Sequence, residues 1–301
     1  MPISTNAEHD SIAPCAVRLR HPLDCLPYRP ERSPAWSPSR QRQIRDHTSP
    51  AWEAPERQNP RIVAAPGLGA VRINFCYAAF QSMTAAHSEK AGRDQYFEGP
   101  HETYGFRLHE IDPSIVDLQY QPIRIEWRSL GGRIQSMTLD FAIETQDGEI
   151  VFGEDKASTD YFDDSELSER LDFAQKFLEA KGASLQRRVA GGLPTRRLRR
   201  IVKDIFDDRR TDFEADQVKM VRNLVELRGG VARLDEVVET IGGHRREALA
   251  VARAMMHRRH ISMPLSAPPM PDVPVTVPPV AAKGRLRAFL NDHVAAEGAP
   301  R

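Results

Sequence analysis

Two acids and a lysine around one tight turn are the residues of this chain whose types and spacing best suit chemistry. Asp140 precedes the turn at Asp147-Gly148, and Glu154 and Lys156 follow it. Asp-Gly is typical of β-hairpins because glycine supplies the positive φ that the turn requires. A two-residue loop would pair Asp140 with Asp155 and turn Glu154 away. A three-residue loop places Asp140 opposite Glu154, with Lys156 on the same face two residues further on.

We adopt the three-residue loop because it gives all three side chains a chemical role. Two opposed carboxylates repel each other, and they persist most readily with a cation between them. Hard oxygen ligands suit Mg²⁺, with Mn²⁺ as a substitute. A lysine on the same face can hold a water or a phosphate oxygen and stabilise charge that develops in a transition state. The alternative at this point is an ordinary ion pair on the solvated face of an edge strand.

The surrounding pattern predicts the elements that position these groups. A helix over about 98–110 carries Glu102 and ends before Pro113, since proline cannot continue a helix. Extended structure over 115–127, a turn at Gly131-Gly132 and a further strand then lead to Asp140. The other elements expected up to residue 210 are a short strand over 70–77, a helix over 167–181, a strand over 184–190 and a helix over 196–208.

The helix over 196–208 begins with a dense basic cluster, which consists of Arg196, Arg197, Arg199 and Arg200. Charge runs are usually solvated helix faces. Here the order of an acid, a turn and then Glu-x-Lys resembles the core pattern of the PD-(D/E)xK nucleases, and because the cluster closes this candidate nuclease domain we favour contact with DNA phosphates. Three short helices follow over 213–227, 234–241 and 244–257, and 258–263 is a candidate wing strand. This pattern is typical of a winged-helix module, in which Arg245, Arg246 and Arg253 would face DNA. A helical module that binds protein is the alternative.

The composition restricts which kinds of binding site and which cellular compartment are expected. The chain has 301 residues, with 42 Lys and Arg against 42 Asp and Glu, so nucleic-acid contact must come from local basic clusters. Its three cysteines form no CxxC pair, which argues against a zinc site and fits a reducing cytoplasm. No apolar run is long enough for a membrane span.

Four segments are expected: a disordered Pro- and Arg-rich tail over 1–60, a nuclease domain over 61–210, a winged-helix-like domain over 211–265, and a Pro-rich linker and tail over 266–301. Within the last segment, residues 284–294 are expected to form an amphipathic helix that docks on a partner.

Four short motifs occur in a fixed order, and their set resembles the TnsA family, the endonuclease subunit of heteromeric bacterial transposases. They are Phe97-Glu98-Gly99-Pro100-His101-Glu102, Gln121-Pro122, Leu139-Asp140-Phe141 and Glu154-Asp155-Lys156. The resemblance covers about residues 61–265. Gly99 replaces a family serine and Leu139 replaces a family proline, and neither residue is a ligand.

The resemblance implies an α+β, restriction-endonuclease-like mixed sheet flanked by helices and followed by a small winged-helix domain. It implies Mg²⁺-dependent hydrolysis of double-stranded DNA at the 5′ ends of a transposon. Asp140, Glu154 and Glu102 would hold the metal, and Lys156 would complete the catalytic set. The implied partners are a DDE-type transposase and an ATP-dependent regulator. The alternatives are another PD-(D/E)xK restriction or repair nuclease, and an inactive DNA-binding or assembly module.

Overall fold

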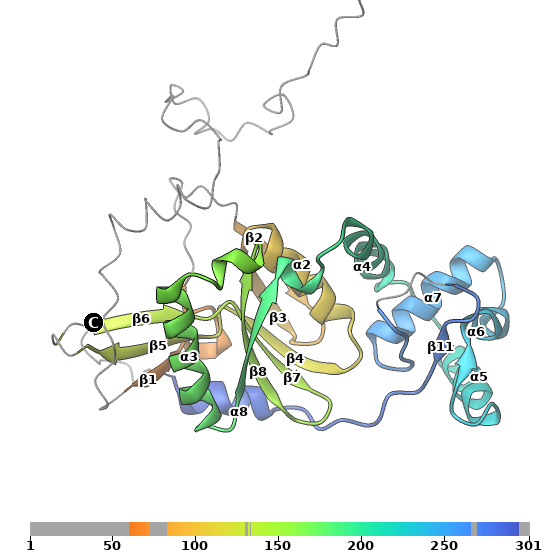
Figure 1. Ribbon diagram of the computed structural model, residues 1–301. Helices are drawn as coiled ribbons and strands as arrows, with labels where there is room; N and C mark the ends of the chain where they lie inside the picture. The colour runs from red at the N-terminus through yellow and green to blue at the C-terminus, as the bar shows by residue number, and fades with distance from the viewer. Residues whose placement is uncertain (1–59, 73–82, 130–131, 133, 266–269, 295–301) are drawn as a thin grey trace, which may run out of the picture. The chain divides into compact units, whose positions relative to one another are not determined.

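The computed structural model describes residues 60–72, 83–129, 132, 134–265 and 270–294 (Figure 1). The expected disordered tail over 1–60 lies, apart from residue 60, outside the described residues, as does most of the strand expected over 70–77. The described chain mixes helices with several small, mostly antiparallel sheets, so the expected α+β class is confirmed. No helix among the described residues has the length and apolar character needed to cross a membrane.

The largest sheet has four strands in the order β4-β7-β8-β9. Its strands are β4 (Ile115–Tyr120), β7 (Phe141–Thr145), β8 (Ile150–Lys156) and β9 (Ser184–Val189). Only β8 and β9 are parallel, and helix α3 (Ser165–Glu179) makes the crossover that a parallel pair requires. This helix begins where Asp164 accepts a hydrogen bond from the Leu167 amide at 3.0 Å.

The β7–β8 hairpin has the register that the three-residue loop predicts. Its ladder ends at Glu144 opposite Ile150, and the Thr145 amide donates to the Glu149 carbonyl at 3.0 Å. Gly148 has a φ of 79°, which a residue with a side chain rarely adopts. The ladder runs as far as Phe141 opposite Gly153, and Asp140 and Glu154 are the next residues beyond this pair, where the ladder becomes irregular because the Asp140 amide donates to the Gly153 carbonyl.

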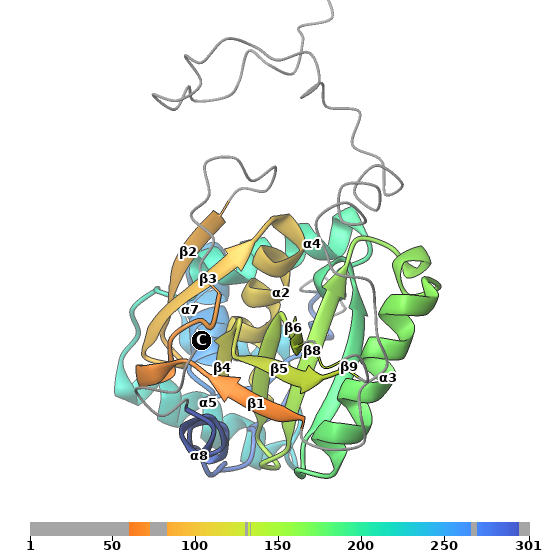
Figure 2. The ribbon, with the colours of Figure 1, turned by 90° about the vertical axis from the view of Figure 1, so that its left-hand side faces the viewer.

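A second sheet continues two strands of the first beyond a bend. It contains β1 (Arg61–Ala64), β5 (Ile123–Arg128) and β6 (Ile134–Thr138) in the order β1-β5-β6 (Figure 2). The chain passes from β4 to β5 through Gln121-Pro122, and from β6 to β7 through Leu139-Asp140. The Gln121 amide donates to the Asp140 carbonyl at 2.9 Å. This hydrogen bond joins the bend between β4 and β5 to the bend between β6 and β7.

Helices cover both faces of the four-stranded sheet (Figure 1). Helix α2 (Pro100–Ile111) packs Phe106 against Tyr120 of β4 and against Phe97 of β3 (Arg93–Glu98). On the other face, α3 and α8 (Arg285–Asp292) bury leucines against Phe152. Each such buried side chain contributes about 1.5–3 kcal/mol. Strand β3 pairs with β2 (Met83–Ser88), a hairpin that the sequence pattern did not predict.

Four helices form the C-terminal helical module: α4 (Arg196–Asp208), α5 (Ala215–Leu227), α6 (Leu234–Ile241) and α7 (Arg245–His257). No regular strand forms over 258–263, where a wing strand was expected. Strand β10 (Ala232–Arg233) pairs instead with β11 (Pro274–Val275), and within 258–263 only Ser262 makes an isolated bridge, to Thr276.

The expected Pro-rich linker is therefore ordered in part. Val273 and Val275 are buried in the core of the helical module. Pro274 lacks an amide hydrogen, and the short two-stranded edge tolerates that loss. The many prolines concealed the alternation of buried and exposed residues here, so composition suggested a linker where the chain adds a strand.

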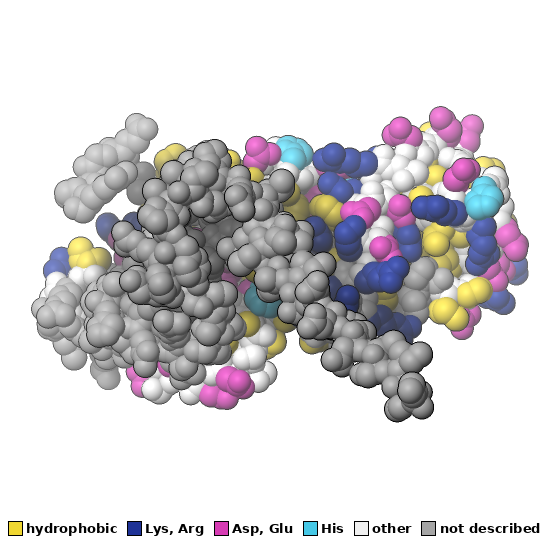
Figure 3. All heavy atoms as spheres, turned by 90° about the horizontal axis from the view of Figure 1, so that it is seen from above, with side chains coloured by type: hydrophobic (Ala, Val, Ile, Leu, Met, Phe, Trp, Pro, Cys, Tyr) yellow, Lys and Arg dark blue, Asp and Glu magenta, His cyan; other side chains and the backbone are white. Residues whose placement is uncertain are grey.

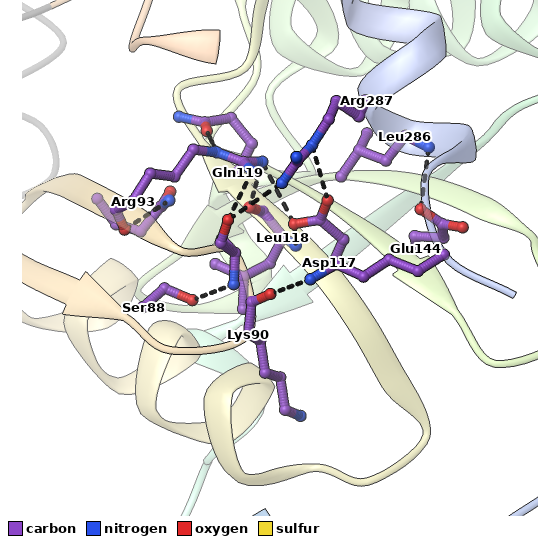
Figure 4. Close-up of polar contacts among 12 residues, drawn as sticks. Ser88, Lys90, Arg93, Asp117, Leu118, Gln119, Glu144, Leu286 and Arg287 are labelled. Atoms are coloured by element: carbon purple, nitrogen blue, oxygen red, sulfur yellow. Dashed lines mark hydrogen bonds and ion pairs between the residues drawn. The ribbon is translucent and has the colours of Figure 1, made fainter. Parts of the chain in front are cut away.

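The C-terminal helix docks on this chain's own sheet. Glu144 of β7 is fully buried and accepts hydrogen bonds from the amides of Gly284, Arg285 and Leu286 at 3.1–3.2 Å (Figure 4). A carboxylate at a helix N-terminus satisfies free amides and complements the helix dipole. The amphipathic helix expected over 284–294 is present as α8, but its described contacts are intramolecular.

Candidate functional site: a buried carboxylate cluster

Asp140 sits at the bend and uses its side chain to continue the ladder between β7 and β8. Its amide donates to the Gly153 carbonyl at 3.0 Å. Its Oδ2 then accepts the Asp155 amide at 2.7 Å, where a main-chain carbonyl would normally serve. Asp140 is buried, so the geometry holds its carboxylate rigidly between the two strands.

Glu102 reaches the same place from the first turn of α2. Its Oε2 accepts hydrogen bonds from the Glu98 amide at 3.0 Å and from Gln121 Nε2 at 3.2 Å. Gly99 occupies the N-cap position with a φ of 88°, which suits glycine and explains the absence of a side-chain cap. The position near the helix N-terminus favours a negative charge on Glu102.

Glu154 and Lys156 lie next to each other on one face of β8. Glu154 Oε1 accepts a hydrogen bond from Lys156 Nζ, and the two groups form an ion pair. Glu154 Oε2 is buried and has no hydrogen-bond partner among the described residues. A buried acceptor without a partner is costly, which makes this oxygen a candidate contact for a ligand.

The charge of Asp140 raises the pKa values of the other two acids. Burial, and then the charge of Asp140, raise the pKa of Glu154 to about 7, although Lys156 opposes the shift. Burial and Asp140 together raise the pKa of Glu102 well above its usual range. Burial also raises the pKa of Asp140, while Lys156 lowers it. The cluster therefore accommodates its full negative charge poorly, and a bound cation would relieve the repulsion.

The donor chemistry of this cluster fits a hard divalent cation. Carboxylate and amide oxygens are the ligands that Mg²⁺ and Mn²⁺ prefer. Two of the oxygens at the site, Glu154 Oε2 and Gln121 Oε1, are buried without partners. Within the described part of the chain, no group of three or more His, Cys, Asp or Glu side chains is arranged to hold a metal ion.

Sequence reasoning missed Arg72, which lies near the acids. Its Nη2 contacts Glu98 Oε2 at 2.9 Å, and its positive charge lowers the pKa values of both Asp140 and Glu154. Arg72 precedes an undescribed segment and belongs to none of the motifs. Its location follows from the Val71 amide, which donates to the Gln121 carbonyl at 2.9 Å. No local pattern in the sequence indicates that pairing.

A second group that the motifs did not reveal lies on the opposite face of β8. Asp155 binds Arg188 in a bidentate pair, with Nε–Oδ1 and Nη2–Oδ2 both at 2.7 Å. Arg188 also contacts His109 Nε2, while His109 Nδ1 lies 3.1 Å from the Tyr120 hydroxyl. Arginine only donates, so His109 Nε2 accepts and Nδ1 carries the proton. Burial and Arg188 lower the pKa of His109 well below its usual range.

This second group leaves no room for a side chain at Gly105. A Cβ there would lie 2.2 Å from Arg188 Nη2 and 3.0 Å from Asp155 Oδ2. Alternation along β8 does predict that Asp155 faces away from Glu154 and Lys156. It does not predict Arg188, because that contact joins residues 33 positions apart.

The basic cluster of α4 offers three exposed side chains: Arg196, Arg197 and Arg200. Lys and Arg side chains also gather on the face seen in Figure 3, the side on which α4 lies in Figure 1. The fourth predicted residue, Arg199, is half-buried. Its Nε donates to the Leu193 carbonyl at 2.9 Å, and its guanidinium lies 5.0 Å from the centre of the Tyr104 ring. Arg199 therefore helps to fix α4 on α2.

The predicted arginines of α7 likewise include both exposed side chains and one that is paired within the chain. Arg245 and Arg246 are exposed at its first turn. Arg253 pairs with Asp208 at the end of α4, and its side chain is only 14% exposed. We therefore remove Arg253 from the candidate DNA-binding residues, since its charge is already matched within the chain. The sequence pattern does not indicate this ion pair, because Asp208 lies 45 residues from Arg253.

A scan of the chain against protein-family models gives no match, and a search against curated proteins gives none either. The argument for function therefore rests on the residues and their geometry.

Proposed function

We propose that this protein is a Mg²⁺-dependent DNA endonuclease of the PD-(D/E)xK type, similar to the TnsA subunit of heteromeric transposases. One observation carries the proposal: Asp140 directly precedes β7 and accepts the Asp155 amide, between Glu154 and Lys156 of β8, and the charge of Asp140 raises the pKa of Glu154. The charge of Asp140 raises the pKa of Glu102 after burial does, and this proximity supports the inclusion of Glu102.

In this proposal each residue has a separate task. Asp140 and Glu154 would bind the cation with carboxylate oxygens, and Glu102 would complete the set directly or through a water, since the described residues do not already place three acids around one ion. When bound, the cation supplies Lewis-acid stabilisation of a phosphate oxygen. Lys156 orients the attacking water and stabilises negative charge on the phosphate. Burial around the cluster lowers the local dielectric constant, which strengthens these electrostatic contributions.

The DNA would follow the exposed arginines of α4 to reach the cluster. Arg196, Arg197 and Arg200 are free to contact phosphates, and Arg245 and Arg246 would add a second contact region on α7. We further propose that the four-stranded sheet and its helices are a restriction-endonuclease-like fold and that α5–α7 form a winged-helix variant. A DDE-type transposase and an ATP-dependent regulator are the proposed partners, by resemblance.

A DNA-binding or assembly module without cleavage is the second candidate. The ion pair between Glu154 and Lys156 favours it, because two groups assigned to catalysis already satisfy each other in part. Its predicted DNA binding would be insensitive to the loss of the acids. Metal binding and DNA cleavage therefore separate the two candidates.

The deciding experiment is a calorimetric titration of the full chain with Mn²⁺ and Mg²⁺. We compare the wild type with an Asp140→Asn, Glu154→Gln double variant, and we use Glu149→Gln as the control because Glu149 is exposed on the same hairpin. Binding that the double variant loses and the control keeps would support the nuclease. Equal binding by all three proteins, or none by the wild type with duplex DNA present, would contradict it.

A DNA-binding assay tests the basic cluster separately. Replacing Arg196, Arg197 and Arg200 by Gln should reduce the salt slope of duplex binding by about 2–3, because each lost phosphate contact removes about 0.9. Arg222→Gln on α5 is an exposed control that lies outside the cluster. An unchanged slope in the triple variant would mean that the cluster is only a solvated helix face.

A further inference from the structure

Gln121 adopts a backbone conformation that its residue type does not favour. Its φ is 50°, in the left-handed region where side chains other than those of Gly, Asn and Asp are uncommon. It also precedes Pro122, and a following proline restricts a residue to extended conformations. Strain of this kind persists only where the surroundings enforce it, and it concentrates at functional sites.

Main-chain hydrogen bonds hold Gln121 in this conformation. Its amide donates to the Asp140 carbonyl at 2.9 Å, and its carbonyl accepts the Val71 amide at 2.9 Å. Glycine would meet the backbone requirement with less strain. The backbone alone therefore does not explain why a glutamine stands at this position.

The Gln121 side chain is directed into the carboxylate cluster. It is fully buried, and its Nε2 donates to Glu102 Oε2 at 3.2 Å. Because the amide nitrogen faces Glu102, Oε1 is the remaining acceptor, and it is buried without a partner in the described part of the chain. A buried amide oxygen without a partner is rare unless something outside the protein satisfies it.

Gln119, two residues earlier, shows what a purely structural buried glutamine looks like in this chain. It is also fully buried, but both ends of its amide are satisfied. Its Oε1 accepts Arg93 Nε at 2.6 Å, and its Nε2 donates to the Tyr120 carbonyl at 2.9 Å (Figure 4). The difference between the two residues is the free oxygen of Gln121.

We propose that Gln121 Oε1 is a ligand for the divalent cation held by Asp140 and Glu154, and that Gln121 Nε2 orients Glu102 toward the same ion. An amide oxygen is a hard ligand like a carboxylate oxygen, and it adds no negative charge to a cluster whose acids already repel one another. The set would then consist of one amide oxygen and carboxylate oxygens at a single bend of the sheet. This inference rests on the proposed metal-dependent function.

The test is a calorimetric titration with Mn²⁺ of the full chain, without DNA. We compare the wild type, Gln121→Met, Gln121→Glu and Gln119→Met, and we record thermal unfolding of each without metal. Methionine keeps the length of the side chain and removes the oxygen, so Gln121→Met should bind Mn²⁺ at least about tenfold more weakly. Gln121→Glu restores an oxygen but loses the Nε2 donor to Glu102, so it should bind Mn²⁺ more tightly than Gln121→Met. Gln119→Met should lose stability but keep an affinity within about twofold of the wild type.

Each outcome decides the proposal. Weaker binding by Gln121→Met, together with recovery in Gln121→Glu, supports the ligand role. Wild-type affinity in Gln121→Met overturns it and leaves the proposed function standing. Equal weakening in both Gln121 variants also overturns the ligand role, since an oxygen at this position would then not matter. Absence of Mn²⁺ binding by the wild type overturns this proposal and the proposed function together.

Discussion

Glu154→Gln is the substitution whose effect can be worked out most directly from the structure. It removes a carboxylate whose pKa is raised from 4.5 to about 7 by burial and by Asp140, and it keeps the shape of the side chain. In the wild type, the folded state holds this proton more tightly than the unfolded state. Stability is therefore lost as the pH rises from about 4.5 to about 7, and the loss is complete above that range.

The size of this loss follows from the two pKa values. Their separation corresponds to about 3 kcal/mol, which is an upper limit because Glu154 titrates together with Asp140 and Glu102. The variant also deprives Lys156 of its ion-pair partner. The difference in unfolding free energy between variant and wild type should thus shift in favour of the variant by about 2–3 kcal/mol over this range.

Urea denaturation in EDTA at pH 4.5, 5.5, 6.5, 7.5 and 8.5 measures this difference. Glu149→Gln on the same hairpin is the matched control, because it makes the same chemical change at an exposed position. Excess Mn²⁺ should stabilise the wild type at pH 8 and abolish the advantage of Glu154→Gln. A flat pH profile for Glu154→Gln would refute the reasoning, since it would mean that the buried carboxyl titrates normally.

Three further substitutions test the framework around the site. Gly105→Ala should lower stability by about 1–3 kcal/mol in urea denaturation, because its Cβ would lie 2.2 Å from Arg188 Nη2; unchanged or increased stability would contradict this crowding. Asp155→Asn should cost about 3–5 kcal/mol because it leaves the Arg188 guanidinium buried without its partner, and Asp155→Leu combined with Arg188→Met should recover much of that loss. Glu144→Ala should cost about 1–3 kcal/mol and speed hydrogen exchange at the Leu286 amide, and exchange at the wild-type rate would mean that Glu144 does not hold α8.

Local signals in the sequence were sufficient for much of the framework. Helix α6 begins and ends at the residues that were expected, because glycines and apolar spacing mark both of its ends. Thr195 caps α4 as its residue type suggests, with its Oγ1 accepting the Leu198 amide at 3.2 Å. The hairpin register followed from Gly148, since the position of one left-handed residue determines the loop length. In each case the decisive interaction lies within a few residues.

The parts that could not be predicted depend on contacts between distant segments. Strand β11 lies about 40 residues from β10, and prolines obscured its alternating pattern. The role of Glu144 was invisible because its partners, the amides that begin α8, lie 140 residues further along the chain. Arg253 was misread for the same reason, since a basic side chain on an exposed-looking helix gives no sign of a distant aspartate. The charge of a basic side chain does not show whether it is available to bind DNA or already forms an ion pair within the chain.

The tripeptide Glu154-Asp155-Lys156 shows how the site and its support are encoded in one strand. Side chains alternate along β8, so Glu154 and Lys156 face the cluster while Asp155 points to the opposite side and binds Arg188. The Asp155 amide, however, donates to Asp140 on the cluster side. Asp155 thus joins both faces: its main chain fixes the carboxylate of Asp140, and its side chain anchors β8 to Arg188 and, through His109, to α2. Because α2 also carries Glu102, a single buried ion pair helps to set the spacing of all three acids.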